Sequence, residues 1–325
     1  MTPTQSKSAS TAVTRWFRRI PLSLIVVVAL LLLLTVTGTV LSDRFATSRN
    51  FLNVFQQAAS LGVVSLGQTL VVLTGGIDLS VGAMISLTSN LTSGLIDGNP
   101  DRVLPVVIGV VALGAAIGCM NGLLTHYLRI HPLIVTLGMA SILQGVTLLY
   151  SLAPLGKVPQ EFQVLAYGRF LGVSIGGLAM IGLFVLAAIF LHFTRTGNAI
   201  YAVGGDPRGA HLMGISVART LAIAYGLSGA LAAITGIYLV SRMGTGDPWR
   251  GEGFELASIT PVVVGGTILA GGRGGVLGTL LGVYLISLLN NLLNFLDVST
   301  FYQWIIQGLI IITAVAINVE RGRRA

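Results

Sequence analysis

The stretch Thr74-Gly75-Gly76-Ile77-Asp78-Leu79-Ser80-Val81-Gly82 interrupts what is otherwise one long apolar run. Apolar residues precede it over 57–73 and continue from it over 79–95, and each stretch approaches the roughly 20 residues that a membrane-crossing helix needs. Two glycines and an acid stand between them. Non-helical backbone cannot face lipid, so this break predicts a discontinuous or re-entrant segment that the rest of the protein shields.

Eight further apolar stretches bring the total to about ten. They are residues 21–41, 103–127, 132–152, 173–193, 220–240, 256–269, 276–295 and 301–317. Only 9% of the 325 residues are charged, whereas a soluble domain carries roughly 25%. We therefore predict an all-α integral membrane protein with some short or discontinuous helices and with membrane lipid as a partner. The composition excludes an ordinary soluble enzyme, a disordered protein and a nucleic-acid-binding domain.

An even number of crossings places both chain ends on one side of the membrane. With both ends inside, twelve of the nineteen Lys and Arg residues face the cytoplasm, which predicts an N-in, C-in orientation. Residues 1–14 are rich in Ser and Thr and are predicted to form a disordered cytoplasmic tail. Residues 15–325 are predicted to form one transmembrane domain with a cytoplasmic loop at 194–220.

Asp78 is the only acid within the two apolar stretches around the break. Burying a charge at membrane depth costs about 2.5–3.5 kcal/mol on insertion scales, which makes Asp78 a functional candidate. One interpretation is that Gly75, Gly76 and Asp78 line a translocation path or move during gating. The other is that Asp78 caps the next helix by accepting from Ser80 or Val81 N–H while the glycines turn the chain. The two interpretations are compatible.

A second candidate lies in the loop 194–220. Asp206 suits the N-cap, Pro207 the first helical position and Gly214 the residue that ends a helix, so a short helix is predicted over 207–213. Leu212 and Met213 would be exposed on a helix too short to be stable alone, so they need a partner surface. We favour docking of a cytoplasmic subunit. The alternative is that the helix packs on the chain's own helix ends.

Gly114, Gly118 and Gly122 recur every four residues and share one helix face, which allows another helix to approach closely. Helix packing is favoured here over a substrate path. Asn121 lies beside this face and is a candidate for an interhelical hydrogen bond or for lining a path.

Mixed charge around Trp249, over 241–255, predicts a structured outer loop that either receives an extracytoplasmic partner or is simply solvated.

Motifs of enzyme chemistry are missing from the sequence. Neither lysine belongs to a G-x-x-x-x-G-K-[ST] loop, and the four histidines lack metal-ligand spacing. No paired carboxylates occur inside the apolar stretches. We therefore expect no catalytic residue, no metal site and no cofactor bound by this chain.

The sequence around the break resembles the signature of permease subunits from ribose-type sugar ABC importers, the binding-protein-dependent monosaccharide and autoinducer-2 transport family. Residues 201–206, Tyr-Ala-Val-Gly-Gly-Asp, followed by Ala210 and Gly214-Ile215, resemble that family's cytoplasmic coupling segment. Gly251-x-Gly253-x-Glu255 and 264–267, Val-Gly-Gly-Thr, resemble its C-terminal half. The resemblance runs from about Asn50 to Val315, with departures at Asp206 and Thr260-Pro261, where the family often has Asn and Ala-Ala.

This resemblance implies a multi-pass permease of a bacterial inner membrane that is not itself an enzyme. It implies a second permease subunit, identical or paralogous, a cytoplasmic ABC ATPase that binds ATP and Mg²⁺, and a periplasmic binding protein that delivers a monosaccharide. The residues that would couple to the ATPase are Tyr201, Gly205, Asp206, Pro207, Arg208, His211, Leu212, Met213 and Gly214. Two other classes stay open: an ion-coupled secondary transporter of a small polar solute, and a membrane protein without transport activity.

Overall fold

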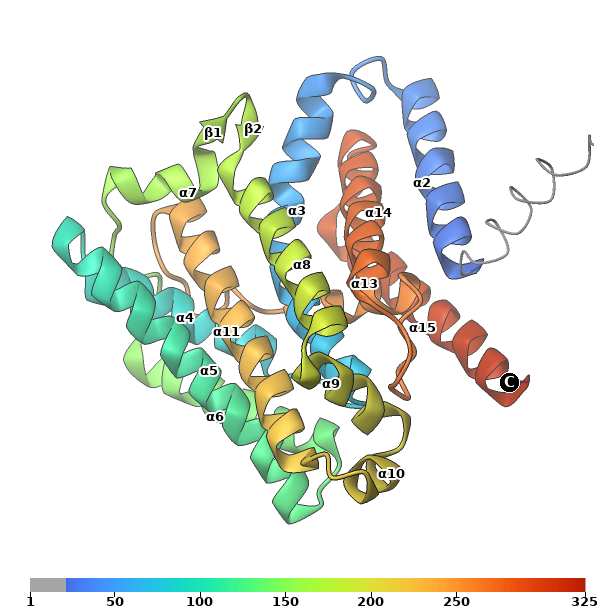
Figure 1. Ribbon diagram of the computed structural model, residues 1–325. Coiled ribbons are helices and arrows are strands. Elements are labelled where there is room, and N and C mark those ends of the chain that lie inside the picture. The colour runs from blue at the N-terminus through green and yellow to red at the C-terminus, as the bar shows by residue number, and fades with distance from the viewer. Residues whose placement is uncertain (1–21, 325) are drawn as a thin grey trace, which may run out of the picture.

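The computed structural model describes residues 22–324, and almost every element in it is a helix (Figure 1). The longer helices are α2 (Leu22–Leu41), α3 (Ser48–Leu73), α4 (Val81–Ile96), α5 (Val103–Leu128), α6 (Pro132–Tyr150), α8 (Ile175–Phe193), α9 (Arg195–Gly205), α11 (Val217–Met243), α14 (Val276–Phe295) and α15 (Thr300–Arg324). The short ones are η1 (Pro100–Arg102), η2 (Gln160–Gln163), α7 (Val164–Tyr167), α10 (Pro207–Leu212), α12 (Phe254–Ala257) and α13 (Ile259–Val264). One antiparallel hairpin pairs β1 (Arg169–Phe170) with β2 (Val173–Ser174).

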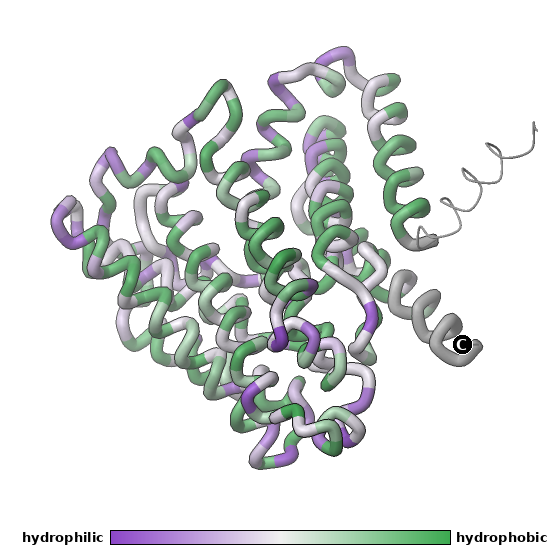
Figure 2. Tube along the Cα trace, in the orientation of Figure 1, coloured by the Kyte–Doolittle hydropathy of each residue, from purple (hydrophilic) through white to green (hydrophobic). Residues whose placement is uncertain are grey.

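Seven of these helices are long and apolar enough to cross a membrane, and three shorter apolar helices accompany them at Val81–Ile96, Phe254–Val264 and Thr300–Thr313. Hydrophobic residues cover the helix bodies, while hydrophilic residues gather at helix ends and connections (Figure 2). Such a surface fits hydrocarbon around the helices and water at their ends. The described part of the chain is therefore an all-α membrane protein.

Helices α3 and α11 form the centre of the bundle. Of their most apolar segments, 83% and 78% of residues are buried, against 11% in α2. Helix α11 packs against α5, α3 and α4, and α3 also contacts α14 and α8 (Figure 1). Buried polar side chains lie on these two helices, for example Gln68 and Ser228, and also along α4, for example Asn90.

Most predicted helix boundaries agree with the structure to within a few residues, and 276–295 agrees fully. Helix α3 begins at Ser48, nine residues before the predicted start, because Thr47 caps it by accepting from Asn50 N–H at 3.3 Å. The apolar stretch 256–269 is short and discontinuous, as some segments were predicted to be: α12 and α13 are separate helices, the second ends at Val264, five residues before the predicted end, and Gly265 to Gly275 form a turn. The predicted tail, residues 1–14, lies outside the described residues.

Candidate functional site

Most of the break between α3 and α4 is buried or half-buried in protein, as its composition predicts, and only Gly75 in it is exposed. Gly75 turns the chain in the left-handed region, with φ of 83°. The side-chain amide of Gln68 is oriented so that its nitrogen and its oxygen both have a partner. The nitrogen donates to Asp78 O at 3.1 Å, and the oxygen accepts from Asp78 N–H at 3.2 Å. Thr136 Oγ1 on α6 donates to Ile77 O at 3.2 Å. Side chains of neighbouring helices therefore replace the hydrogen bonds that a continuous helix would make.

The Asp78 carboxylate is the centre of a buried hydrogen-bond network, with 1% of the residue exposed. Its Oδ1 accepts from Ser80 N–H at 3.0 Å and from Ser80 Oγ at 2.6 Å. Its Oδ2 accepts from Ser228 Oγ on α11 at 2.9 Å. The predicted bond from Ser80 N–H to Asp78 is thus present. In addition, Asp78 ties the break to the central helix α11, a contact 150 residues away in sequence.

Asn121 on α5 joins the same network, donating from Nδ2 to Ser80 Oγ at 3.0 Å. The glycines beside Asn121 explain why α5 can approach the backbone of α11 so closely. A Cβ atom on Gly114 or Gly122 would lie 2.6 Å from the carbonyl oxygen of Gly229 or Leu221 on α11, and one on Gly118 would overlap with Tyr225 O. The glycine face therefore serves helix packing, and that packing brings Asn121 to the break.

Gly76, the other glycine of the break, lies against the buried ring of Tyr225 on α11. A Cβ atom at Gly76 would overlap with the Tyr225 hydroxyl. Gly75, Gly76, Asp78 and Asn121, which the sequence singled out, are thus gathered where α3, α4, α5 and α11 meet. Gln68 and Ser228 were not predicted, because nothing in the local sequence shows that their side chains reach Asp78.

The segment after α11 is a structured loop, as predicted, and it is attached to α4. Gly251 N–H donates to Ser86 Oγ at 2.9 Å, and Gln144 Nε2 on α6 donates to Pro248 O at 3.1 Å. Arg250 pairs with Asp247 at 3.3 Å within the loop. The loop therefore covers the hydroxyl-bearing face of α4, a role that its composition alone did not indicate.

The predicted docking helix is present as α10. Asp206 Oδ1 accepts from Arg208 N–H at 3.0 Å, Pro207 occupies the first turn, and Gly214 follows with φ of 81°. The helix packs against α9 through the buried Ala210, as the alternative held, but Leu212 and Met213 are 86% and 73% exposed and stay uncovered. Tyr201 and Gly205 lie on α9, and His211 lies on α10.

Most of the loop 194–220 is helical, because α9 precedes α10 in it. The sequence did not predict α9, whose residues are mostly small or polar. Partial burial raises the pKa of the Tyr201 phenol above its ordinary value of 10.0, so the hydroxyl stays protonated at neutral pH. It donates to Gly274 O at 3.2 Å, and this bond fastens α9 to the turn before α14.

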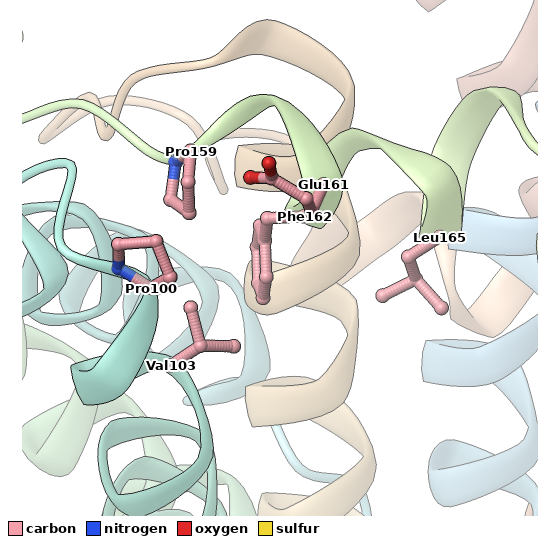
Figure 3. A pocket seen from close by; sticks show the side chains of 6 residues that line it. All are labelled: Pro100, Val103, Pro159, Glu161, Phe162 and Leu165. Atoms are coloured by element: carbon pink, nitrogen blue, oxygen red, sulfur yellow. The ribbon is translucent and has the colours of Figure 1, made fainter.

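A hollow of about 330 Å³ lies beside the start of α5, at the end of the molecule opposite to α9 and α10 (Figure 3). Its lining residues are Pro100, Val103, Pro159, Glu161, Phe162 and Leu165. None of them belongs to the break or to α9 and α10. Within residues 22–324, no three His, Cys, Asp or Glu side chains are grouped so that they would hold a metal ion.

Residues 50–315 match the family described as "Branched-chain amino acid transport system / permease component". The chain belongs to this family. It is 40% identical over 296 residues to the ribose import permease protein of Bacillus subtilis strain 168, covering 90% of this chain and 91% of that protein. It is 40% identical over 299 residues to the ribose import permease protein of Escherichia coli K12, covering 90% and 92%.

More distant relatives carry names with other sugars. The D-allose transport system permease protein of Escherichia coli K12 is 33% identical over 294 residues, covering 89% of each chain. The fructose import permease protein of Rhizobium meliloti is 35% identical over 302 residues, covering 90% of this chain and 83% of that protein. No solved structure matches the chain significantly. The permease family and the seven apolar helices together show that the chain is a multi-pass protein of the inner membrane.

Proposed function

We propose that this permease is the membrane subunit of an ATP-driven importer that carries a monosaccharide. The observation that carries the proposal is 40% identity over 90% of the chain to two proteins named as ribose import permeases. Relatives named for allose and fructose extend the class to small sugars in general. The substrate is therefore proposed as a class, and not as one sugar.

The proposal includes ten crossings with both chain ends in the cytoplasm. Seven long apolar helices and three shorter ones supply the ten segments. Helix α4 and the broken pair α12 and α13 are too short to cross alone, but the irregular backbone at 76–80 and 265–269 is buried or half-buried in protein, where it is tolerated. The end of the molecule that carries α9 and α10 then faces the cytoplasm, in agreement with the distribution of Lys and Arg.

ATP and Mg²⁺ are held by a separate ATPase subunit, which docks on α10 through Leu212 and Met213. Two exposed apolar side chains at the end of α10 support this assignment, because α10 buries Ala210 and packs against α9 while Leu212 and Met213 stay uncovered. Nucleotide binding favours one access state of the permease through contacts that differ between the two states, and hydrolysis resets it. A periplasmic sugar-binding protein and a second permease subunit complete the importer.

The alternative, an ion-coupled secondary transporter, needs a buried charge that an ion can reach. Asp78 is the only buried acid among the described residues, and its oxygens already accept hydrogen bonds from Ser80 and Ser228. This arrangement favours a carboxylate that holds helices together over one that binds a travelling ion.

Reconstitution in proteoliposomes tests the proposal. The permease is purified with the subunits that accompany it, and uptake of radiolabelled ribose, allose and fructose is measured one sugar at a time with and without ATP. We expect uptake of at least one sugar that requires ATP and the binding protein. Uptake by the permease alone, driven by an ion gradient without ATP, would contradict the proposal and favour the secondary transporter.

A further inference from the structure

Three segments that are far apart in sequence meet backbone to backbone at the end of the molecule where α9 and α10 lie (Figure 1). They are the end of α3 with the first residues of the break, 73–76, the end of α9, 204–205, and the turn 270–274. Gly272 N–H donates to Leu73 O at 2.9 Å. This bond satisfies one of the last carbonyls of α3, which its own helix leaves unpaired. We name this contact the glycine junction.

Gly204 is the residue at which the junction has no space for a side chain. A Cβ atom there would overlap with the Leu73 carbonyl oxygen and would lie 2.6 Å from Gly272 N. Both neighbours are backbone atoms, so no side chain can rotate away to make room. Even alanine at this position would push α9 away from the end of α3.

The turn contributes two glycines that contact the other two segments. A Cβ atom on Gly271 would lie 2.7 Å from Gly75 N and 2.8 Å from Gly204 O. One on Gly272 would lie 2.8 Å from Gly205 N. Gly271 and Gly272 also have φ of 90° and 71°, which L side chains rarely adopt. All three segments therefore touch through their main chains.

The position of the junction connects the two candidate sites. On one side, Gly205 directly precedes Asp206, the N-cap of the docking helix α10. On the other, Gly75 lies three residues before Asp78, whose carboxylate ties the break to α11. Contacts through backbone leave no slack from side-chain rotation, and close-packed elements transmit displacement. A shift of α10 therefore reaches the break through this contact.

We propose that Gly204 is a positioning residue of the transport cycle: its missing side chain allows the junction to pass movement of the docking helix to the Asp78 break. This inference rests on the proposed function, since the movement comes from the ATPase. In this proposal the junction is the contact that both sites act on, the docking helix from one side and the substrate path from the other.

The test uses the complete importer in proteoliposomes with the Gly204→Ala variant, and it measures ATP hydrolysed per sugar imported. We expect the ATPase to co-purify and to hydrolyse ATP as in the wild type, while uptake falls about tenfold, within the range of coupling free energies between sites. A purely structural defect would instead lower co-purification and thermal stability together. Gly182→Ala is the matched control, because a methyl group there meets no atom within 4 Å.

A second variant keeps the inference testable even where Gly204→Ala does not fold. Tyr201→Phe keeps the ring and removes only the hydrogen bond to Gly274 O. We expect the number of ATP molecules hydrolysed per sugar imported to rise about 2- to 10-fold, because one neutral hydrogen bond contributes a free energy that corresponds to this factor. An unchanged ratio in a folded Gly204→Ala complex, or in Tyr201→Phe where the first variant is unfolded, overturns the inference. Loss of ATPase binding in Gly204→Ala also overturns it, because Gly204 would then act in docking.

The same experiment separates this inference from the proposed function. ATP-dependent uptake in the wild type and in Gly182→Ala, together with an unaffected Gly204→Ala, removes the inference and leaves the function standing. Absence of ATP-dependent uptake in the wild type removes both.

Discussion

At the scale of single residues, the hydrogen bonds of Asp78 explain how an acid can be buried between apolar helices. Its two oxygens accept three hydrogen bonds from Ser80 and Ser228, and its backbone is paired with Gln68. The hydrogen bonds of Asp78 itself are satisfied, whereas Asn121 Oδ1 and the Tyr225 hydroxyl beside it have no partner among the described residues. A buried polar group with its bonds made specifies one arrangement of the helices around it. The network therefore stabilises the break in one conformation and makes any change of that conformation costly.

The first prediction compares two substitutions of Asp78. Asn keeps the shape, accepts from Ser80 N–H through Oδ1 and donates to Ser228 through Nδ2, so the free energy of unfolding should fall by only about 1 kcal/mol. Leu leaves buried donors of Ser80 and Ser228 without an acceptor, at about 1–3 kcal/mol for each. Thermal unfolding in detergent and uptake per expressed molecule measure both effects.

Ser228→Ala is the control for this pair, because it removes a single donor and keeps the carboxylate. Its stability should fall between those of the wild type and Asp78→Leu. An Asp78→Leu protein with wild-type stability and uptake would show that the network has no role.

The residue scale also shows what the sequence can and cannot reveal. Asp78, Gly75 and Gly76 are recognisable because an acid and two glycines are conspicuous in an apolar run. Ser228 and Gln68 look like ordinary polar residues in apolar helices, and only the packing of α11 against α3 and α4 brings them to Asp78. The role of Gly204 is likewise invisible in the sequence. It follows from the contact with Leu73 O, which belongs to a residue 131 positions earlier in the chain.

At the scale of elements, α10 carries the second prediction. The double change Leu212→Ser with Met213→Ser should leave the membrane domain folded, because both side chains are exposed. Each would contribute about 1.5–3 kcal/mol when buried against the ATPase. Since 1.4 kcal/mol corresponds to about tenfold in affinity, the ATPase should largely fail to co-purify.

Leu171→Ser provides the matched control for the α10 variant. Leu171 is 89% exposed on the β1–β2 hairpin, away from α10, so its substitution should leave ATPase binding unaltered (Figure 1). Full ATPase co-purification and uptake in the α10 double variant would place the docking surface elsewhere, with the Arg273 turn as the next candidate.

The third prediction concerns the fastening of α3 to α14. Asn50 and Asn291 exchange two side-chain hydrogen bonds, at 2.9 and 3.1 Å. Interhelical polar pairs in membranes contribute about 0.6 kcal/mol on average and about 1.7 kcal/mol at most. A double-mutant cycle with Asn50→Ala and Asn291→Ala, followed by thermal unfolding, should give a coupling energy in that range. Additive losses would show that the pair does not interact.

Elements differ in how well the sequence predicts them. Helix α14 matches its prediction because a run of apolar residues and a glycine turn before it define both ends. Helix α9 was missed because Gly, Thr and Asn within it weaken helical propensity, and its contacts with α8, α10 and α11 compensate. For α12 and α13 the sequence predicted only a short apolar stretch over 256–269, because hydropathy does not show that the helix is interrupted at Ser258 and ends at Val264.

At the scale of the whole molecule, the arrangement assigns different tasks to the two ends. One end carries α9, α10 and the glycine junction, and the other carries the β1–β2 hairpin, η1 and the hollow of Figure 3 (Figure 1). The Asp78 network lies where α3, α4, α5 and α11 meet, and the junction leads to it from the first end. An importer needs this asymmetry, because ATP acts on one side of the membrane and the solute arrives from the other.

The fourth prediction tests that orientation. In a Cys119→Ala background, cysteine is placed at Leu212 on α10 and at Leu171 on the hairpin, which are 86% and 89% exposed. Because the excess of Lys and Arg predicts that α10 faces the cytoplasm, a membrane-impermeant maleimide should label Leu171→Cys in intact cells. It should label Leu212→Cys only after permeabilisation, which also shows that this site is reactive. Labelling of Leu212→Cys from outside would invert the orientation, and with it the assignment of α10 as the docking site for the ATPase.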